Sequence, residues 1–582
     1  MRVPLAVLCA VLCAAPALAQ RGGVTADTPL RPVSRATALV DARVVVAPGR
    51  VLDRATVLVR DGRIEAVGRD LRVPPDADVL RADSFTVYAG FVDALGLAGV
   101  PKPPEAERYT GNRGDPPRER AGVTPDRDVR TLFDPADARI AALRALGFGA
   151  AHVAPRGGVL SGTGSVVLLR SPGRGEVAQD VVLTGPLALV ARLETAQGVY
   201  PTTPMGVAAV FREAFENARR RTAQAEGTAR GGQRPRYDAA LDALAPVVAG
   251  DRRLVLVAAN PLDAFRALGL ARDVGVAPIL AGLTDATPVA SRLREARVAV
   301  FAPLALPDTV ALDSLARGIV LPPSGGVASV QNRRVRSFRD LPDDRAALTA
   351  ERREAVRRAE ASPAALASAG VPFAFATLDA EPAKILPGLR RFVRAGLAPD
   401  AALAALTTEP ARLLGLSDDL GVVERGRLAN LVVVRGDLFA DSAAVRYVFV
   451  EGVRFENAAK PSRAASGDSS AVEVLGTWAL TVTTPGGDQT GAFTITGSPG
   501  AYTGTTTVDG DTYPLDAVTL DGYQLAFRFS VPELGGAISV TGTVSGLSFS
   551  GTASVGPLGT FPATATRTPD RASGDQRVGR SD

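Results

Sequence analysis

The stretch RLVLVAANPLDAFRALGLARDVGVAPILAGLTDATPVASRLREARVAVFAPL, residues 253–304, decides the fold. It contains three short apolar runs, RLVLVAA, VAPILAG and VAVFAPL. Two longer segments with a helical pattern, PLDAFRALGLARDVG and ATPVASRLREAR, separate them. Short buried strands that alternate with helices are typical of a parallel sheet covered by helices. The stretch therefore predicts an α/β fold.

The same alternation extends over residues 89–420. The helical pattern PADARIAALRALG and the strand pattern FGAAHVAP come before the quoted stretch, and SPAALASAG and VPFAFATLD come after it. A segment of this length favours a (β/α)8, TIM-like barrel. A doubly wound open sheet is the alternative, although no glycine-rich dinucleotide loop follows an early strand.

All-β segments lie on both sides of the predicted barrel. Residues 36–88 and 421–456 have strand patterns, and Asp61-Gly62 is a hairpin signal between two apolar runs. After a linker at residues 457–475, residues 476–567 contain short period-two strands rich in Thr and Gly. They predict a C-terminal β-sandwich or small barrel. The polar residues 568–582 predict a disordered tail.

The first residues predict export. Residues 1–19 combine Arg2, an apolar run and the small-residue ending Ala17-Leu18-Ala19, which is the pattern of a cleaved signal peptide, and residues 20–35 form a polar leader. We therefore expect a periplasmic or secreted protein. Both cysteines of the chain lie within the signal, so the mature protein has neither disulfides nor thiolate chemistry.

Charge and hydropathy exclude two classes of partner. The formal net charge of +5 is small for 582 residues, and the arginine clusters are not interleaved with aromatic residues. We therefore expect no nucleic-acid partner. After the signal, no stretch reaches the length of a membrane span. A small-molecule ligand or a protein partner remains.

Residues 36–455 resemble the amidohydrolase superfamily, and among its members the imidazolonepropionase-like group. VVVAPGRVLDRATVLVRDGRIEAVG is similar to the family's opening strands. LAALTTEPARLLGLSDDLGVVERGRLANLVVVRGDLF is similar to its passage from the last barrel helix back into a β unit. The resemblance implies that residues 36–88 and 421–456 form one composite β-sandwich beside a barrel at residues 89–420. It also implies metal-dependent hydrolysis of non-peptide carbon–nitrogen bonds.

In that family, zinc or another divalent metal is held by an H-x-H pair after the first barrel strand, two further histidines and a carboxylate. In YAGFVDALGLAGV, residues 88–100, the H-x-H positions fall on Leu95 and Leu97. The resemblance places the other two histidine positions at Ala258 and near Ala281. The carboxylate position falls on Asp379, although the family's usual spacing would select Leu378.

Composition limits the metal chemistry further. The chain has one histidine, His152, so a site of three or four imidazoles cannot be built. Asp93, Asp379 and waters could hold Mg2+ or Ca2+ weakly. Each weak catalytic candidate also has a structural reading: Asp93 and Asp379 as turn or helix-cap carboxylates, and His152 as a hydrogen-bonded core residue.

The sequence therefore favours a pseudoenzyme that has lost its metal and acts by binding a ligand or a partner, with no cofactor. One alternative is a hydrolase of non-peptide C–N bonds that uses an atypical carboxylate-based metal site. Another is a binding module centred on the C-terminal β domain, with the barrel as its scaffold.

Overall fold

The computed structural model describes residues 36–103, 108–173, 176–228, 236–307, 341–457, 474–484, 487–498, 501–508, 510–521, 523–531, 536–555 and 559–567. The chain divides into two compact units, Met1–Ala458 and Ala459–Asp582. The predicted signal, leader and tail, and nearly all of the predicted linker, lie outside the described residues.

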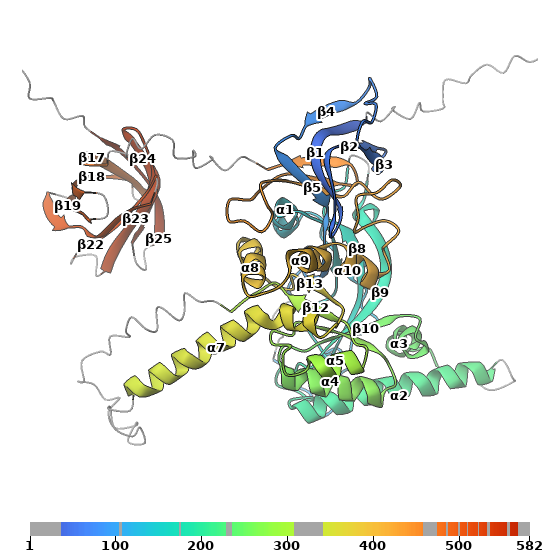
Figure 1. Ribbon diagram of the computed structural model, residues 1–582. Coiled ribbons are helices and arrows are strands. Elements are labelled where there is room, and N and C mark those ends of the chain that lie inside the picture. The colour runs from blue at the N-terminus through green and yellow to red at the C-terminus, as the bar shows by residue number, and fades with distance from the viewer. Residues whose placement is uncertain are drawn as a thin grey trace, which may run out of the picture. The chain divides into compact units, whose positions relative to one another are not determined.

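An eight-stranded sheet forms the centre of the first unit (Figure 1). Its strands, in spatial order, are β6 (Phe91–Gly96), β7 (Phe148–Val153), β8 (Leu160–Leu168), β9 (Val182–Arg192), β10 (Arg253–Val257), β11 (Pro278–Ala281), β12 (Val300–Pro303) and β13 (Phe373–Ala376). The two outer strands meet, because the Leu378 N–H donates to the Leu95 carbonyl at 2.9 Å and Gly96 forms a parallel bridge with Leu378. The sheet is therefore a closed barrel, and the predicted barrel class is confirmed.

One strand departs from the regular (β/α)8 pattern that the sequence predicts. β8 runs antiparallel to both β7 and β9, whereas the other neighbouring strands are parallel. Only residues 154–159 connect β7 to β8, and a parallel crossover needs about a dozen residues or more. The chain instead turns back at Gly157 and Gly158, whose φ angles of 72° and 82° suit glycine. The regular barrel prediction is wrong at this strand.

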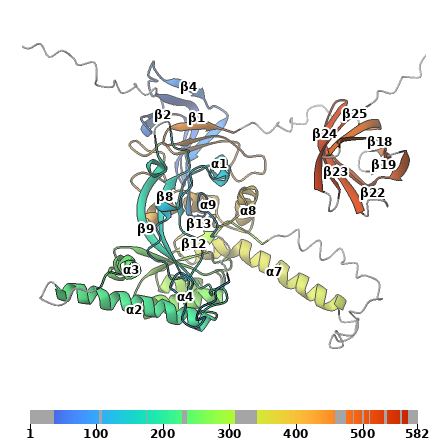
Figure 2. The same ribbon diagram turned by 180° about the vertical axis from the view of Figure 1, so that it is seen from behind.

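Helices surround the barrel, and α2 and α7 extend away from it (Figures 1 and 2). They are α1 (Ala138–Ala145), α2 (Pro204–Thr228), α3 (Ala239–Ala249), α4 (Pro261–Asp273), α5 (Ala290–Glu295), α7 (Leu341–Ser368), α8 (Pro382–Arg394), α9 (Pro399–Leu406) and α10 (Thr408–Leu414). α4 begins where the sequence indicates, because the Asn260 side chain accepts from the Asp263 N–H and Pro261 occupies the first turn. Within the described part of the chain, no helix is both long and apolar enough to cross a membrane.

The strands divide their side chains between two apolar layers. On β10, Leu254 and Leu256 pack with the surrounding helices, whereas Val255 points into the barrel. The barrel residues that pack together in this interior cluster are Val92, Ala94, Leu95, Ala150, Ala154, Val166, Leu168, Ala188, Val190, Val255, Ile279, Ala281, Ala299, Phe301, Ala374 and Ala376. The barrel centre is therefore filled with small and medium apolar side chains rather than polar ligands.

A second sheet in the first unit is built from both ends of that unit, and its blue and orange strands lie side by side in Figure 1. It contains β1 (Thr37–Ala47), β2 (Arg50–Arg60), β3 (Arg63–Gly68), β4 (Asp78–Arg81), β5 (Phe85–Ala89), β14 (Leu431–Arg435), β15 (Ala444–Val450) and β16 (Val453–Glu456). β5 and β14 join the two halves in an antiparallel ladder from Ala89–Leu431 to Phe85–Arg435. The polar side chain of Arg170, after β8, anchors this sheet to the barrel through Glu451 at 2.8 Å.

The second unit is an all-antiparallel sheet of nine strands around one aromatic core. The strands are β17 (Gly476–Thr484), β18 (Gly487–Ser498), β19 (Ala501–Val508), β20 (Asp511–Pro514), β21 (Asp516–Asp521), β22 (Gln524–Val531), β23 (Gly536–Ser545), β24 (Ser548–Val555) and β25 (Gly559–Arg567). Trp478, Phe493, Phe527 and Phe549 are fully buried at its centre. β19 and β20 approach β21 and β22, so the sheet is nearly closed.

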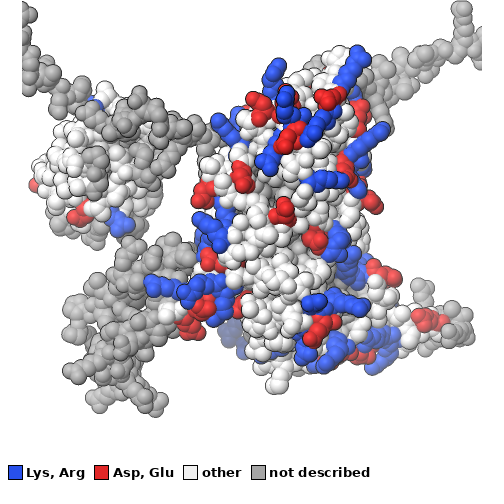
Figure 3. All heavy atoms as spheres, viewed as in Figure 1, with Lys and Arg blue, Asp and Glu red and all other residues white. Residues whose placement is uncertain are grey.

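Basic and acidic side chains are interspersed over the face of the first unit that Figure 3 shows. Ion pairs between charged side chains of this unit include Arg60 with Asp76 at 2.9 Å and Arg212 with Asp273 at 2.7 Å. Such pairs contribute about 0–1 kcal/mol each, so apolar burial in the clusters described above supplies most of the stability.

Candidate functional site

The carboxyl ends of the barrel strands are the place where barrels keep their chemistry. Here that end is apolar. Leu95 and Ala281 belong to the interior cluster. Leu97, two residues after Leu95, is also buried. Ala258 packs instead with the outer helices, although its N–H donates to the Ala281 carbonyl at 2.8 Å. The strand alternation turns the Val257 side chain into the barrel, so the Ala258 side chain points away from Leu95 and Ala281.

Asp93 lies fully buried on β6, beside the seam where β6 meets β13. Its Oδ1 accepts from the Thr377 N–H at 2.8 Å and from the Leu95 N–H at 3.2 Å, and its Oδ2 accepts from the Thr377 hydroxyl. These bonds take up the donors at a place where the register of β6 shifts between Asp93 and Gly96. The carboxylate therefore closes the barrel seam, in addition to the turn role that the sequence allowed.

Gly96 makes room for this arrangement. A Cβ at position 96 would lie 2.2 Å from Asp93 Oδ2 and 3.1 Å from Thr377 Oγ1. Real Cβ atoms do not approach other atoms that closely, so a side chain here would displace the carboxylate or the hydroxyl. Glycine is therefore required by packing at this position rather than by its backbone angles.

Burial dominates the electrostatics of Asp93. It raises the pKa of Asp93 to about 6, although the Thr377 and Leu95 donors oppose the shift. The carboxyl group therefore titrates close to neutral pH. Both of its oxygens accept hydrogen bonds from donors at the seam.

His152 is fully buried on β7 and points into the barrel. Its Nδ1 donates to the Ala94 carbonyl at 2.9 Å, which leaves Nε2 as the unprotonated nitrogen. Nε2 has no hydrogen-bond partner among the described residues, and the ring packs edge-to-face with Phe301 at 6.5 Å. Burial lowers the pKa of His152 to about 4, so the ring is neutral at physiological pH. The sequence allowed His152 to be either a catalytic residue or a hydrogen-bonded core residue, and these surroundings are those of a core residue.

Asp379 lies outside the interior, at the carboxyl end of β13. Its side chain is 56% exposed and pairs with Arg139 at 2.6 Å and Arg156 at 3.5 Å. Burial alone would raise the pKa of Asp379, but the two guanidinium groups hold it below its usual value. The sequence did not single out either arginine, because α1 and the loop after β7 bring them to this carboxylate only in the folded chain.

Arg156 also bonds to the backbone, in addition to its ion pair with Asp379. Its Nε donates to the Val100 carbonyl at 3.0 Å and its Nη2 to the Leu97 carbonyl at 3.3 Å. It therefore ties the loop after β6 to Asp379. The three sequence candidates have different partners: Asp93 bonds Thr377 and Leu95 at the seam, His152 bonds Ala94 in the interior, and Asp379 pairs with the two arginines.

We expect Asp379→Asn to change the free energy of unfolding by about 1 kcal/mol or less, because exposed ion pairs are screened and weakly stabilising. Denaturant unfolding followed by circular dichroism at 222 nm measures it. The matched control is Asp273→Asn, which removes an exposed carboxylate paired with Arg212. A loss above about 2 kcal/mol would show that Asp379 is more than a surface partner.

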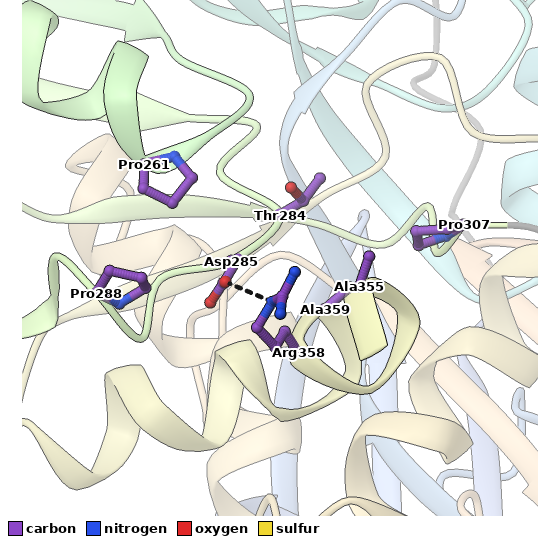
Figure 4. A pocket seen from close by; sticks show the side chains of 8 residues that line it. All are labelled: Pro261, Thr284, Asp285, Pro288, Pro307, Ala355, Arg358 and Ala359. Atoms are coloured by element: carbon purple, nitrogen blue, oxygen red, sulfur yellow. Dashed lines mark ion pairs between the residues drawn. The ribbon is translucent and has the colours of Figure 1, made fainter. Parts of the chain in front are cut away.

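A hollow among the described residues lies at the carboxyl ends of β10, β11 and β12 (Figure 4). This rim cavity has a volume of about 480 Å3. Its lining residues are Pro261, Thr284, Asp285, Pro288, Pro307, Ala355, Arg358 and Ala359. They come from the first turn of α4, the loops after β11 and β12, and α7. Asp285 and Arg358 form an ion pair at 3.3 Å within it.

Sequence reasoning missed the rim cavity. One feature of the sequence could have indicated it: prolines follow three consecutive barrel strands, at the end where barrels place functional loops. The partner residues on α7 lie far along the chain from those loops, so no local pattern links Arg358 to Asp285.

The first unit thus combines a closed α/β barrel with a sheet built from both ends of that unit. Residues 259–455 match the profile of the amidohydrolase family. A crystal structure of an amidohydrolase from Thermotoga maritima MSB8 is 22% identical, with a TM-score of 0.56, over 72% of this chain and all of that one. Residues 259–455 are thus similar to the amidohydrolase family, and the solved amidohydrolase shares the fold of this chain.

A second solved structure, a prolidase complexed with N-methylphosphonate-L-proline, is 18% identical with a TM-score of 0.42, over 72% of this chain and all of that one. Among curated proteins, no sequence matches this chain.

The residues at the family's metal position do not fit a divalent metal. Asp93 gives its oxygens to seam donors, and Asp379 lies between two cationic side chains that repel a metal ion. Within the ranges that the structure describes, no group of three or more His, Cys, Asp or Glu side chains comes together as a metal site. No hydrolytic step through a metal can be assigned to these residues.

Proposed function

We propose that this protein is an exported, amidohydrolase-related pseudoenzyme, in which the barrel binds a small molecule instead of hydrolysing it with a metal. One observation carries the proposal: the carboxylates nearest the family's metal position are already engaged. Asp93 bonds Thr377 and Leu95, and Asp379 pairs with Arg139 and Arg156.

The packing at the lost-ligand positions supports the same proposal. Leu95 and Ala281 join the interior cluster, and Phe301 packs against His152 where polar ligands and water would be needed. A catalytic metal site keeps an open position for water and several protein ligands. An interior filled by apolar side chains provides neither.

The rim cavity supplies the binding site in this proposal. Its volume falls in the range of about 300–1,000 Å3 that is typical of small-molecule sites. It combines apolar walls with one ion pair at the functional end of the barrel. The export part of the proposal rests on the signal pattern of residues 1–19.

The alternative is a hydrolase with a carboxylate-based metal site. It requires Asp93 to exchange its three donors for a metal and Asp379 to leave both arginines. Both exchanges cost the hydrogen bonds and ion pairs described above, and a metal held by two carboxylates and water would be weakly bound. The alternative is therefore less well supported than binding.

Elemental analysis of the purified chain tests the proposal, together with hydrolysis assays on amide and lactam substrates with and without Zn2+, Mn2+ or Mg2+. We expect less than about 0.1 zinc per chain and no metal-dependent turnover, because the ligand set is lacking. Leu95→His with Leu97→His should not restore either property, since Ala258 and Ala281 still supply no ligand.

The result that overturns the proposal is about one metal per chain, with hydrolysis that a chelator abolishes. If Asp379→Asn then also abolished that hydrolysis while Asp273→Asn did not, the carboxylate-based metal site would replace the binding role.

A further inference from the structure

The lining of the rim cavity carries one charge of each sign. Its ionisable lining residues are Asp285 and Arg358, whose Oδ2 and Nε lie 3.3 Å apart. Glu354, which does not line the cavity, lies 3.9 Å from Arg358 and pairs with Arg357 as well. Asp285 is held in place by its other oxygen, which accepts from the Thr287 N–H at 3.1 Å. Its side chain is 17% exposed, and that of Arg358 is 47% exposed. The cavity therefore presents a fixed negative group beside a more accessible positive group (Figure 4).

An adjacent pair of opposite charges selects against ligands that carry net charge. A simple carboxylate that reaches Arg358 also meets Asp285, and an amine that reaches Asp285 meets Arg358. In both cases the ligand's single charge lies at a similar distance from Asp285 and from Arg358, so the attraction to one and the repulsion from the other nearly cancel. A ligand with both charges, arranged in the opposite order, gains an attraction at each end.

We propose that the rim cavity binds an α-amino acid with an apolar side chain, in its zwitterionic form. This inference rests on the binding role proposed above and names its ligand class. An α-amino acid carries its ammonium and carboxylate on one carbon, so the ammonium can contact Asp285 while the carboxylate contacts Arg358. The charged termini of a peptide lie further apart and match an adjacent pair less well.

The remaining walls select the side chain. Pro261 and Pro288 lie on one side of the ion pair and Pro307 on the other, and Ala355 and Ala359 come from α7 (Figure 4). Proline rings are rigid, and alanine has no conformational freedom to lose, so these walls can bury an apolar group at little entropic cost. Burying such a group contributes favourably in proportion to the apolar area removed from water.

Isothermal titration calorimetry on the full chain tests the ligand class. The probes are L-leucine, 4-methylpentanoate, which lacks the ammonium, and 3-methylbutylamine, which lacks the carboxylate. We expect L-leucine to bind at least tenfold more tightly than either analogue. Equal affinities for all three probes would show that the apolar walls bind without recognising the zwitterion, and would overturn the inference.

Variants locate the site. Asp285→Asn keeps an oxygen for the Thr287 N–H, and Arg358→Gln removes the cation; each should weaken L-leucine binding at least tenfold. Arg353→Gln is the control, because Arg353 is exposed on the same helix and does not line the cavity. Unchanged affinity in both Asp285→Asn and Arg358→Gln, with all variants folded by circular dichroism, would place any binding elsewhere and contradict the inference.

The two proposals fail separately. Absence of heat with L-leucine and also with L-phenylalanine would reject the amino-acid ligand, while metal content and turnover still decide the pseudoenzyme proposal. Conversely, a stoichiometric metal with chelator-sensitive hydrolysis would reject the pseudoenzyme, whatever the calorimetry shows.

Discussion

Replacing Asp93 with alanine is expected to destabilise the first compact unit by about 3 kcal/mol or more. The substitution leaves the Thr377 N–H, the Thr377 hydroxyl and the Leu95 N–H without their acceptor inside the barrel. A buried donor that loses its partner costs about 1–3 kcal/mol, and here three donors are affected at the seam that closes the sheet.

Asp93→Asn is the control for this prediction. Asparagine has nearly the same shape, its Oδ1 can accept from both N–H groups, and its amide can donate to the Thr377 hydroxyl. We therefore expect this variant to match or exceed the wild-type stability at pH 7. If alanine and asparagine destabilised the protein equally, the seam bonds would not be the cause.

The two units can be followed independently in these experiments. All helices of the described residues lie in the first unit, so circular dichroism at 222 nm reports mainly on it. The chain has a single tryptophan, and Trp478 is buried in the second unit. Tryptophan fluorescence should therefore show an unchanged transition in Asp93→Ala, which serves as an internal reference.

The second large effect is on the pH dependence of stability. The pKa of Asp93 rises from 3.8 to about 6 in the folded chain, so the folded state binds the proton more tightly than the unfolded state. Its contribution to stability is fully present below about pH 4 and is lost as the pH rises through about 6. The pKa of His152 falls from 6.5 to about 4, so its contribution is present above about pH 6.5 and is lost as the pH falls through about 4.

These two slopes oppose each other between about pH 4 and pH 6. Each shift is roughly two pKa units, or about 3 kcal/mol at 1.36 kcal/mol per unit. Because the titration is incomplete at both limits, we expect the stability of Asp93→Asn relative to wild type to rise by about 2 kcal/mol from pH 4 to pH 6. The relative stability of His152→Asn should instead fall by a similar amount from pH 4 to pH 6.5.

Denaturant unfolding at several pH values, followed at 222 nm, measures both differences. Asp379→Asn is the comparison, because its exposed carboxylate should produce a small difference. Parallel pH profiles for the wild type, Asp93→Asn and His152→Asn would contradict the prediction, since they would mean that neither buried group titrates differently on folding.

The candidate site was only partly predictable. The lack of histidine ligands follows from composition, because a single histidine cannot supply an imidazole site whatever the fold. The roles of the carboxylates do not follow. Thr377 and Asp93 lie at opposite ends of the barrel sequence, and the donors around a buried group are set by which strands become neighbours.

The sequence by itself determined the alternation of strands and helices, the strands at both ends of the first unit and the loss of the imidazole ligands. These depend on residue types and on the periodicity of buried positions, which are local properties. The tertiary structure decided the antiparallel turn of β8, the outward direction of Ala258, the closing of the seam by Asp93 and the rim cavity between the loops and α7. Each of these depends on contacts between residues that are distant in sequence or on the register of paired strands, and side-chain direction reverses with a shift of one residue.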